Sequence, residues 1–339
     1  MNQEISLTEV RKSVMSSKNK KAVGIDNIPN EILKNETCIN VLHRLFNACF
    51  QSGKIPSLWL QAIISPIPKS SSKDARVPLN YRGISLLSTL SKIYTSLLNI
   101  RLMKFLDKNN ILADEQNGFR KDRSCIDHIF VLNSIIKNRM NQGRSTFAAF
   151  IDFKKAFDFV DRELLLLKLM DNGIHGNIYQ SIKSLYHGTS ACVRLNGQLT
   201  DWFDIYTISG VRQGDALSPS LFAIYVNDLL LELKSINGGI NAGDENISCL
   251  AYADDIVIVA NSPEKLNTLL RRLDEWCVQW ALELNIEKSQ IVHFRPKRVQ
   301  RTNFEFKLNN EILKYVSNYK YLGVIFDEHL SYETAVNTL

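Results

Sequence analysis

Three aspartates in apolar surroundings are the residues of this sequence whose type and spacing could do chemistry. Asp254 and Asp255 are adjacent inside "CLAYADDIVIVA" (249–260), and Asp152 follows the apolar run "TFAAFI" upstream. Buried carboxylates must be paired with a cation, hydrogen-bonded or protonated, because an uncompensated charge is expensive to bury. If the three meet at the tips of neighbouring strands, they form a strongly negative pocket that is stable only with metal in it.

Such a pocket suits hard divalent cations. Oxygen ligands select Mg²⁺ or Mn²⁺, and two such ions about 3.5–4 Å apart clamp the attacking and leaving oxygens of a phosphoryl transfer. A structural explanation exists for each residue as well. Asp254 and Asp255 could form a solvated turn, although Asp-Asp lacks the glycine that hairpin turns favour, and Asp152 could cap a helix at a strand end.

The composition is that of an ordinary globular protein. The chain has 339 residues, 45% of them hydrophobic and 22% charged, which is enough for two domains or one large domain. Its net charge of +6 permits a polyanionic partner without requiring one. The six cysteines form no CxxC pair, so we expect neither a disulfide framework nor a zinc site. With no membrane span and no signal peptide at the start, we expect an intracellular protein, cytoplasmic or nuclear, that is not secreted.

The elements that must position the aspartates follow from periodicity and punctuation. The front of the chain is mostly helical, beginning with a capping box of Ser6 and Glu9, and the back is α+β. The pattern predicts a strand at 62–69, a polar loop at 70–78, long helices at about 85–107 and 124–141, a strand over "TFAAFIDF", a hairpin turning at Asn196-Gly197, a helix with Ser218 at its N-cap, a hairpin around Asp254, and a helix at about 263–281.

Motifs around the aspartates resemble those of one enzyme family. "YADD" (252–255) lies between apolar strands, with "DFKKAFD" (152–158) upstream and "SGVRQGDALSPSLF" (209–222) between them. Together they resemble the reverse transcriptases of non-LTR (LINE-like) retrotransposons. Further strings are similar to the family's motifs in the right order: "KKAVGIDNIPNEILK" (20–34), "SPIPK" with "NYRGISLLS" (65–88), "EQNGFRKDRSCIDHI" (115–129), "WALELNIEKS" (280–289) and "YKYLGVIFD" (319–327).

The resemblance implies an α+β fold of the right-hand polymerase type, with mostly helical fingers and an antiparallel palm sheet with helices. The implied domains are fingers at 1–145, the first metal-binding palm segment at 146–175, a connection with a hairpin at 176–208, the rest of the palm at 209–318, and the primer grip with a truncated end at 319–339. The thumb would be largely missing. We therefore expect a fragment of a longer element-encoded protein, or a degenerate copy.

The resemblance also implies roles for site residues. Asp152, Asp254 and Asp255 would be catalytic and hold two Mg²⁺ or Mn²⁺ ions, with the carbonyl of Phe153 as a further metal ligand, and Lys288 would protonate the leaving pyrophosphate. The ring of Phe157 would collide with a 2′-hydroxyl and so select dNTPs. The other residues implied to bind nucleotide are Lys69, Arg82, Gln213 and Gly214, and those implied to bind template or primer are Arg120, Lys121, Arg123, Gly210, Tyr252, Tyr321, Leu322 and Gly323.

Several of these residues have ordinary alternatives. Phe157 alone would be a core phenylalanine, Lys69 and Lys288 could be solvated surface lysines, and the basic cluster 120–123 could be a solvated loop. The glycines near Gln213 could form an ordinary turn that leads into a helix.

The sequence thus predicts an RNA-directed DNA polymerase, a nucleotidyltransferase that takes an RNA template, a DNA primer and dNTPs. No membrane and no small-molecule cofactor beyond the metal is expected. Two alternatives stay open: a group II intron-like reverse transcriptase and maturase, and an inactive or domesticated RNA-binding derivative.

Overall fold

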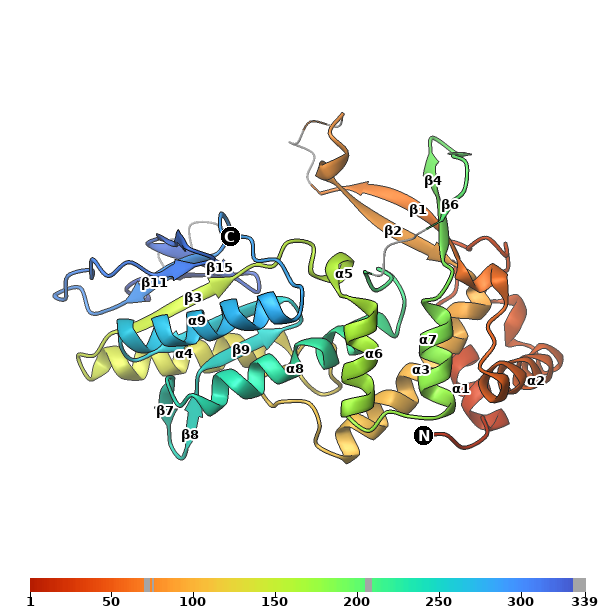
Figure 1. Cartoon of the computed structure of the whole chain (residues 1–339), viewed down its shortest axis with the longest axis horizontal. Helices are drawn as coiled ribbons and strands as arrows, with labels where there is room; N and C mark the ends of the chain where they lie inside the picture. Colours follow the sequence, from red (N-terminus) through yellow and green to blue (C-terminus); the bar gives the residue numbers. More distant parts are fainter. Residues whose placement is uncertain (70–73, 75, 205–208, 332–339) are drawn as a thin grey trace. The chain divides into compact units, whose positions relative to one another are not determined.

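The computed structural model describes residues 1–69, 74, 76–204 and 209–331 (Figure 1). Parts of the predicted loop at 70–78, of the predicted connection at 176–208 and of the predicted end at 319–339 therefore lie outside the described residues. The chain divides into two compact units, each built from two stretches of sequence. The first unit is Met1–Ile111 with Asp161–Leu221, and the second is Leu112–Val160 with Phe222–Leu339.

The first unit combines helices with a small mixed sheet. Its sheet has the order β2-β1-β4-β5, with β6 also paired to β4; β1 is antiparallel to β2 and parallel to β4. The helices are α1 (Leu7–Ser16), α2 (Glu36–Ser52), α3 (Thr89–Lys108), α6 (Arg162–Asp171) and α7 (Asn177–Leu185), and short 3-10 turns are η1 (Ile32–Lys34), η2 (Ser57–Leu60) and η3 (Pro78–Asn80). The strands are β1 (Gln61–Pro68), β2 (Tyr81–Leu87), β4 (Ser190–Leu195), β5 (Gln198–Leu199) and β6 (Phe203–Asp204).

Local signals explain most boundaries of the first unit. The capping box of Ser6 and Glu9 at the start of α1 is confirmed. The hairpin turn at Asn196-Gly197 is confirmed as well, since both residues have positive φ between paired Leu195 and Gln198. The helix expected at about 85–107 was wrong at its start. Residues up to Leu87 pair with β1 instead, and the hydroxyl of Ser88 caps α3.

The second unit is built on an antiparallel sheet core with the order β14-β11-β3-β10-β9, in which only β14 runs parallel to its neighbour. Its strands are β3 (Thr146–Ile151), β9 (Cys249–Tyr252), β10 (Asp255–Ala260), β11 (Gln290–Phe294) and β14 (Lys314–Tyr315). Three two-stranded hairpins add β7 (Ile240–Ala242) with β8 (Glu245–Ile247), β12 (Lys307–Leu308) with β13 (Glu311–Ile312), and β15 (Asn318–Tyr321) with β16 (Val324–Asp327). The helices are α4 (Cys125–Asn141), α5 (Ala156–Phe159), α8 (Ser218–Ser235), which begins in the first unit, and α9 (Pro263–Gln279).

Strand alternation divides the core of the second unit between two faces of the sheet. Ala148 and Phe150 of β3 pack with Val257 of β10 and with α4 in one cluster, which also takes in Phe326 of β16. The intervening residues of β3 point the other way, where α9 packs on β3 and β10 (Figure 1). All six residues of β3 are buried, so the strand that leads to Asp152 is rigid.

The boundaries of the units differ from the expected domains. Residues 112–145 belong with the sheet of the second unit, because 115–117 bond to β9 and α4 packs on β3. Residues 161–175 and 209–221 belong with the first unit. The expected N-cap role of Ser218 was also wrong. The structure places Ser218 inside the first turn of α8, and its hydroxyl donates to the carbonyl of Arg212. No helix in the described ranges is long and apolar enough to cross a membrane.

Candidate functional site

The three aspartates come together at one end of the sheet in the second unit. Asp152 directly follows β3, and Asp255 is the first residue of β10, whose next residue Ile256 pairs with the last residue of β3. Because Asp255 also pairs with Tyr252, Asp254 sits in a two-residue turn between β9 and β10. β3 and β10 are neighbours, so Asp152 and Asp255 lie at the same end of adjacent strands, as the sequence led us to expect.

The electrostatics of this group are those of crowded negative charge. Loss of hydration, followed by the charges of Asp254 and Asp152, raises the pKa of Asp255 to about 6. Within the described residues, no group of three or more His, Cys, Asp and Glu side chains is arranged so that it could hold a metal ion. The assignment of two metal ions to Asp152, Asp254 and Asp255 therefore stays a prediction.

Asp152 is held by the segment after α9. The amide of Asn285 donates to the Asp152 carboxylate at 2.9 Å, and its backbone N–H donates to the Asp152 carbonyl at 2.8 Å. The hydroxyl of Ser289 accepts the N–H of Asp152 at 3.1 Å. Lys288 places its Nζ 3.6 Å from the same carboxylate while its side chain stays 69% exposed. The sequence had indicated Lys288 but not Asn285 or Ser289, although all three lie in the string "WALELNIEKS".

A second segment clamps the turn that carries Asp254. The buried side chain of Gln116 accepts the N–H of Ala253 at 2.9 Å and the N–H of Gly118 at 2.8 Å. Ala253 has φ +57°, a left-handed conformation that alanine rarely adopts, so this hydrogen bond helps to fix a strained turn. A Cβ atom on Gly118 would collide with the backbone nitrogen of Ala253, which explains the glycine. The motif "EQNGF" had suggested a template contact only.

Two phenylalanines, Phe153 and Phe157, follow Asp152 in the sequence and belong to the same unit. Phe157, in the short helix α5, stacks on Phe222 of α8 with ring centroids 4.8 Å apart and planes 17° apart. Because Phe222 is fully buried, the half-buried ring of Phe157 has a fixed support. Phe153, whose carbonyl the resemblance had made a metal ligand, forms an isolated antiparallel bridge with Leu284.

The loop that carries Gln213 and Gly214 belongs to the first unit. The carbonyl of Gln213 accepts the N–H of Ser85 on β2 at 3.3 Å. Gly214 has φ +104°, and a Cβ there would lie 3.2 Å from the carbonyl oxygen of Ser85. The carbonyl of Gly210 accepts a hydrogen bond from Nε–H of Arg162 at 2.9 Å. The loop is therefore fixed to β2 and to α6 by its backbone.

Charged side chains anchor the same loop from inside. The guanidinium of Arg212 donates to the carbonyls of Trp59 and Leu185 and lies 5.7 Å from the centre of the Tyr186 ring. Burial raises the pKa of the Asp215 carboxyl, and the N–H of Leu217 and the positive charge of Arg212 oppose that rise. Sequence reasoning did not identify this network, because nothing in the local pattern marks Arg212 or Asp215 as interior.

Lys69 and Arg82 lie at the β1–β2 hairpin of the first unit. Arg82 is exposed and pairs across the ladder with Ile67. The N–H of Lys69 donates to the carbonyl of Asn80 at 2.8 Å, which extends the ladder by one step beyond β1. The expected nucleotide-binding residues are thus divided between the two units. Lys69, Arg82, Gln213 and Gly214 belong to the first unit and Phe157 to the second.

The basic cluster is partly engaged in holding its own loop. Arg120 donates to the carbonyls of Ala113 and Gln116, and Arg123 pairs with Asp114 at 2.8 Å. Lys121 is 89% exposed and lies 3.8 Å from Asp122. Contact of these residues with template phosphates stays a prediction.

The predicted primer grip is the β15–β16 hairpin, in which Leu322 is half-buried and Gly323 is exposed. Tyr321 is 3% exposed and packs into the core beside Phe150, so its side chain cannot contact a primer. Leu322 and Gly323 form the turn, both with positive φ, and contact of the hairpin with a primer stays a prediction. Tyr252 is half-buried, and its ring lies 6.5 Å from that of Phe119.

Comparisons with known proteins show the family to which the chain belongs. The family described as reverse transcriptase (RNA-dependent DNA polymerase) matches residues 67–326. The chain is 30% identical to the probable RNA-directed DNA polymerase from transposon BS of Drosophila melanogaster, over 97% of this chain and 36% of that protein. It is 26% identical to the RNA-directed DNA polymerase from mobile element jockey of Drosophila funebris, over 99% and 36%.

A more distant relative and a solved structure extend the comparison. The Pol polyprotein from type-1 retrotransposable element R2 of Nasonia vitripennis is 26% identical over 86% of this chain and 28% of its own length. The chain spans about a third of the length of the curated relatives it matches. Apo telomerase from Candida tropicalis, truncated from the C-terminal domain, is similar in fold with a TM-score of 0.53 and 11% identity, covering 88% of this chain and 65% of that one.

Proposed function

This chain belongs to the reverse transcriptase (RNA-dependent DNA polymerase) family, and on that basis we propose that it extends a DNA primer with dNTPs copied from an RNA template. The proposed parent is a non-LTR retrotransposon protein, as the names of the relatives suggest. One observation carries the proposal. Asp152 follows β3 and Asp255 begins the adjacent strand β10, so both lie at the same end of the sheet, with Asp254 in the turn beside them.

The two units suggest the parts of a right-hand polymerase. The second unit, with the carboxylates on an antiparallel sheet flanked by α4 and α9, corresponds to a palm. The first unit, with Lys69 and Arg82 on its hairpin, corresponds to fingers. A fold similar to that of a telomerase supports this division without defining its boundaries.

The chemistry of the donor set suits divalent cations, but the described side chains would have to move closer together to share an ion. The side chains of Asp152, Asp254 and Asp255 offer only hard oxygen donors. Loss of hydration, followed by the charges of Asp254 and Asp152, raises the pKa of Asp255. Bound Mg²⁺ or Mn²⁺ ions would lower the pKa of an attacking hydroxyl and neutralise charge on the phosphates. Asn285 and Ser289 would hold Asp152 in a single orientation for this purpose, as outer partners of metal ligands do.

Other residues of the chain would bind and select the nucleotide. Phe157, supported by Phe222, would exclude a 2′-hydroxyl, so the enzyme would prefer dNTPs. Lys288, beside Asp152 but largely exposed, would donate a proton to the leaving pyrophosphate. Gln213 and Gly214 would contact the nascent base pair through a loop fixed to β2. A Phe157→Ala variant that still rejects rNTPs would remove the sugar-selection role.

Primer extension on poly(rA)/oligo(dT) with dTTP and Mg²⁺ or Mn²⁺ tests the proposal. We expect incorporation by the wild type and at least a hundredfold loss in Asp254→Asn, since a metal ligand is removed. Asp244→Asn is the matched control, because Asp244 is an exposed carboxylate in the β7–β8 turn of the same unit. Equal incorporation by wild type and Asp254→Asn would refute the catalytic assignment.

Mn²⁺ binding provides a readout that does not depend on turnover. Electron paramagnetic resonance should detect weaker Mn²⁺ binding by Asp254→Asn than by Asp244→Asn. Metal-independent RNA binding without any incorporation would favour the alternative of an inactive RNA-binding derivative.

A further inference from the structure

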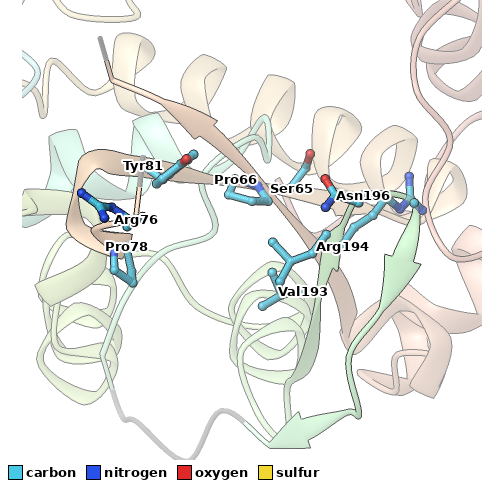
Figure 2. A pocket seen from close by; sticks show the side chains of 10 residues that line it. Ser65, Pro66, Arg76, Pro78, Tyr81, Val193, Arg194 and Asn196 are labelled. Carbon is cyan, nitrogen blue, oxygen red and sulfur yellow. The ribbon is translucent and has the colours of Figure 1, made fainter. Parts of the chain in front are cut away.

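A cleft of about 650 Å³ opens in the sheet of the first unit, between β1 and the β4–β5 hairpin (Figure 2). One wall carries Pro66 of β1, Tyr81 of β2 and Arg76 of the segment before η3. The other carries Val193 and Arg194 of β4 (Figure 2). Its volume is within the usual range of ligand-binding pockets, about 300–1,000 Å³. None of the residues that line it is Asp or Glu.

The sequence of β1 explains why the sheet opens here. β1 pairs with β4 only up to Ile64, opposite Val193. The N–H of Lys69 points to β2, where it donates to Asn80. Since successive N–H groups alternate sides along a strand, those of residues 66 and 68 would point to β4, and both residues are proline, which has no N–H. The ladder therefore ends, and β4 turns to pair Arg194 with Leu199 of β5.

The cleft is separate from the positions proposed to face the triphosphate. Residues directly opposite each other in an antiparallel ladder share a face. Arg82 pairs with Ile67, whereas Tyr81 pairs with Pro68, so Tyr81 and the prolines lie on the opposite face of the hairpin from Arg82. Arg82 is not among the residues that line the cleft, although Ser65, on the same face of the hairpin as Arg82, is.

The chemistry of the walls suits an anionic chain with flat rings. No hydrogen bond or ion pair joins the half-buried Arg194 guanidinium to another described residue. Arg76 is held in two-point contact by Asp74 at 3.1 and 3.2 Å, yet its side chain is 90% exposed. Guanidinium groups bind phosphates, and tyrosine rings stack on unpaired bases.

We propose that this cleft binds single-stranded RNA, with a base against Tyr81 and Pro66 and a phosphate at Arg194. The Arg194 guanidinium, together with a lining that contains no Asp or Glu, favours this occupant over a protein segment, although Asp74 already pairs with Arg76. The inference rests on the proposed function, because the RNA template is the single-stranded partner that would reach this unit. It adds a binding site in the first unit, whereas the three aspartates belong to the second.

Fluorescence anisotropy with a labelled oligouridine RNA and the full chain tests the site. Arg194→Glu should weaken binding about tenfold and reduce the dependence of log affinity on log salt by about one phosphate contact. Arg44→Glu is the matched control, since Arg44 is exposed on α2 of the same unit and makes the same charge change. Equal weakening by both variants, or none by Arg194→Glu, would overturn the proposal and leave the free sheet edge to a protein segment.

The ring requirement is tested with Tyr81. Tyr81→Phe should bind RNA like the wild type, while Tyr81→Ala should bind several-fold more weakly; thermal unfolding of each variant checks the fold. Equal affinity of Ala and Phe variants would contradict base stacking at Tyr81. The two proposals fail separately. If the wild type extends a primer but Arg194→Glu binds RNA as tightly as the wild type, only the cleft proposal is refuted. If Arg194→Glu weakens RNA binding but primer extension does not depend on Asp254, only the polymerase proposal is refuted.

Discussion

Two carboxylates, one in each unit, respond to their surroundings in opposite directions. Arg101 binds Glu9 at the start of α1 and lowers the pKa of that carboxyl to about 2. At the start of β10, loss of hydration and two neighbouring aspartates raise the pKa of Asp255 to about 6. The protein thus stabilises the ionised form of Glu9, and it destabilises the ionised form of Asp255.

The same contrast runs through the segments that hold the proposed site. In the second unit the turn of Asp254 is clamped by the neutral amide of Gln116, and Asp152 is held by Asn285 and Ser289. In the first unit the loop of Gln213 is held by charged groups, Arg212 and Asp215, that favour each other's ionised form.

The way in which the two segments are held indicates which of them is expected to bind a cation. Neutral amide and hydroxyl groups hold the aspartates, and the exposed Lys288 lies 3.6 Å from the Asp152 carboxylate. Under the proposed function, a bound cation would add positive charge at this group. A loop that only frames a site can be fixed by charges that cancel within the protein. Four variants test this comparison, from the largest expected effect to the smallest.

Replacing Arg212 by Ala should cause the largest loss of stability. It removes donors to the carbonyls of Trp59 and Leu185 and leaves the buried Asp215 with less positive charge nearby. We expect the free energy of unfolding to fall by about 3 kcal/mol, as when one member of a buried charge network is removed. Chemical denaturation measures this, with Arg44→Ala as an exposed control. A change below that of the control would mean that charge does not hold this loop.

Replacing Gln116 by Leu tests the neutral clamp. The buried N–H groups of Ala253 and Gly118 would lose their acceptor, which should cost about 2 kcal/mol of stability. Polymerase activity should fall further than stability predicts, because the turn that carries Asp254 is no longer fixed. Thermal unfolding and primer extension are compared with Gln142→Leu, an exposed change on the same unit. Full activity in a destabilised Gln116→Leu would show that the clamp does not position the aspartates.

The sequence predicted the chemistry of the site better than its supports. The apolar strands next to Asp152 and Asp255 could be predicted because a short continuous run of apolar residues is a local signal of a buried strand. The partners of those residues could not. Gln116 is 137 positions from Ala253 and Asn285 is 133 from Asp152, and no local pattern marks an amide for a contact at that range. The start of α3 was mispredicted for a related reason, since Ser85 to Leu87 are recruited by β1.

Glu9→Gln tests compensated charge in the first unit. The folded-state pKa of Glu9 is below its unfolded value, so its contribution to stability is present above about pH 4.5 and is lost as the pH falls toward 2. The side chain is about a third exposed, so solvent screening limits the expected loss at pH 7 to about 1 kcal/mol. Denaturation at pH 7 and pH 3 should show the variant closer to wild type at the lower pH. A constant difference would exclude the ion pair as its cause.

Asp255→Asn should have the smallest effect and the opposite sign. The folded-state pKa of Asp255 is above its unfolded value, so ionisation of this carboxyl lowers the free energy of unfolding. This loss of stability is absent below about pH 4, where the group is protonated in both states, and is complete above about pH 6. Removing the charge should therefore stabilise the protein at pH 7.5 in EDTA by up to about 1 kcal/mol, because the side chain is partly exposed and solvent screens its charge. Added Mn²⁺ should raise the melting temperature of the wild type more than that of the variant. A variant less stable than wild type in EDTA would mean that the aspartates are already compensated, and the contrast between the units would then be lost.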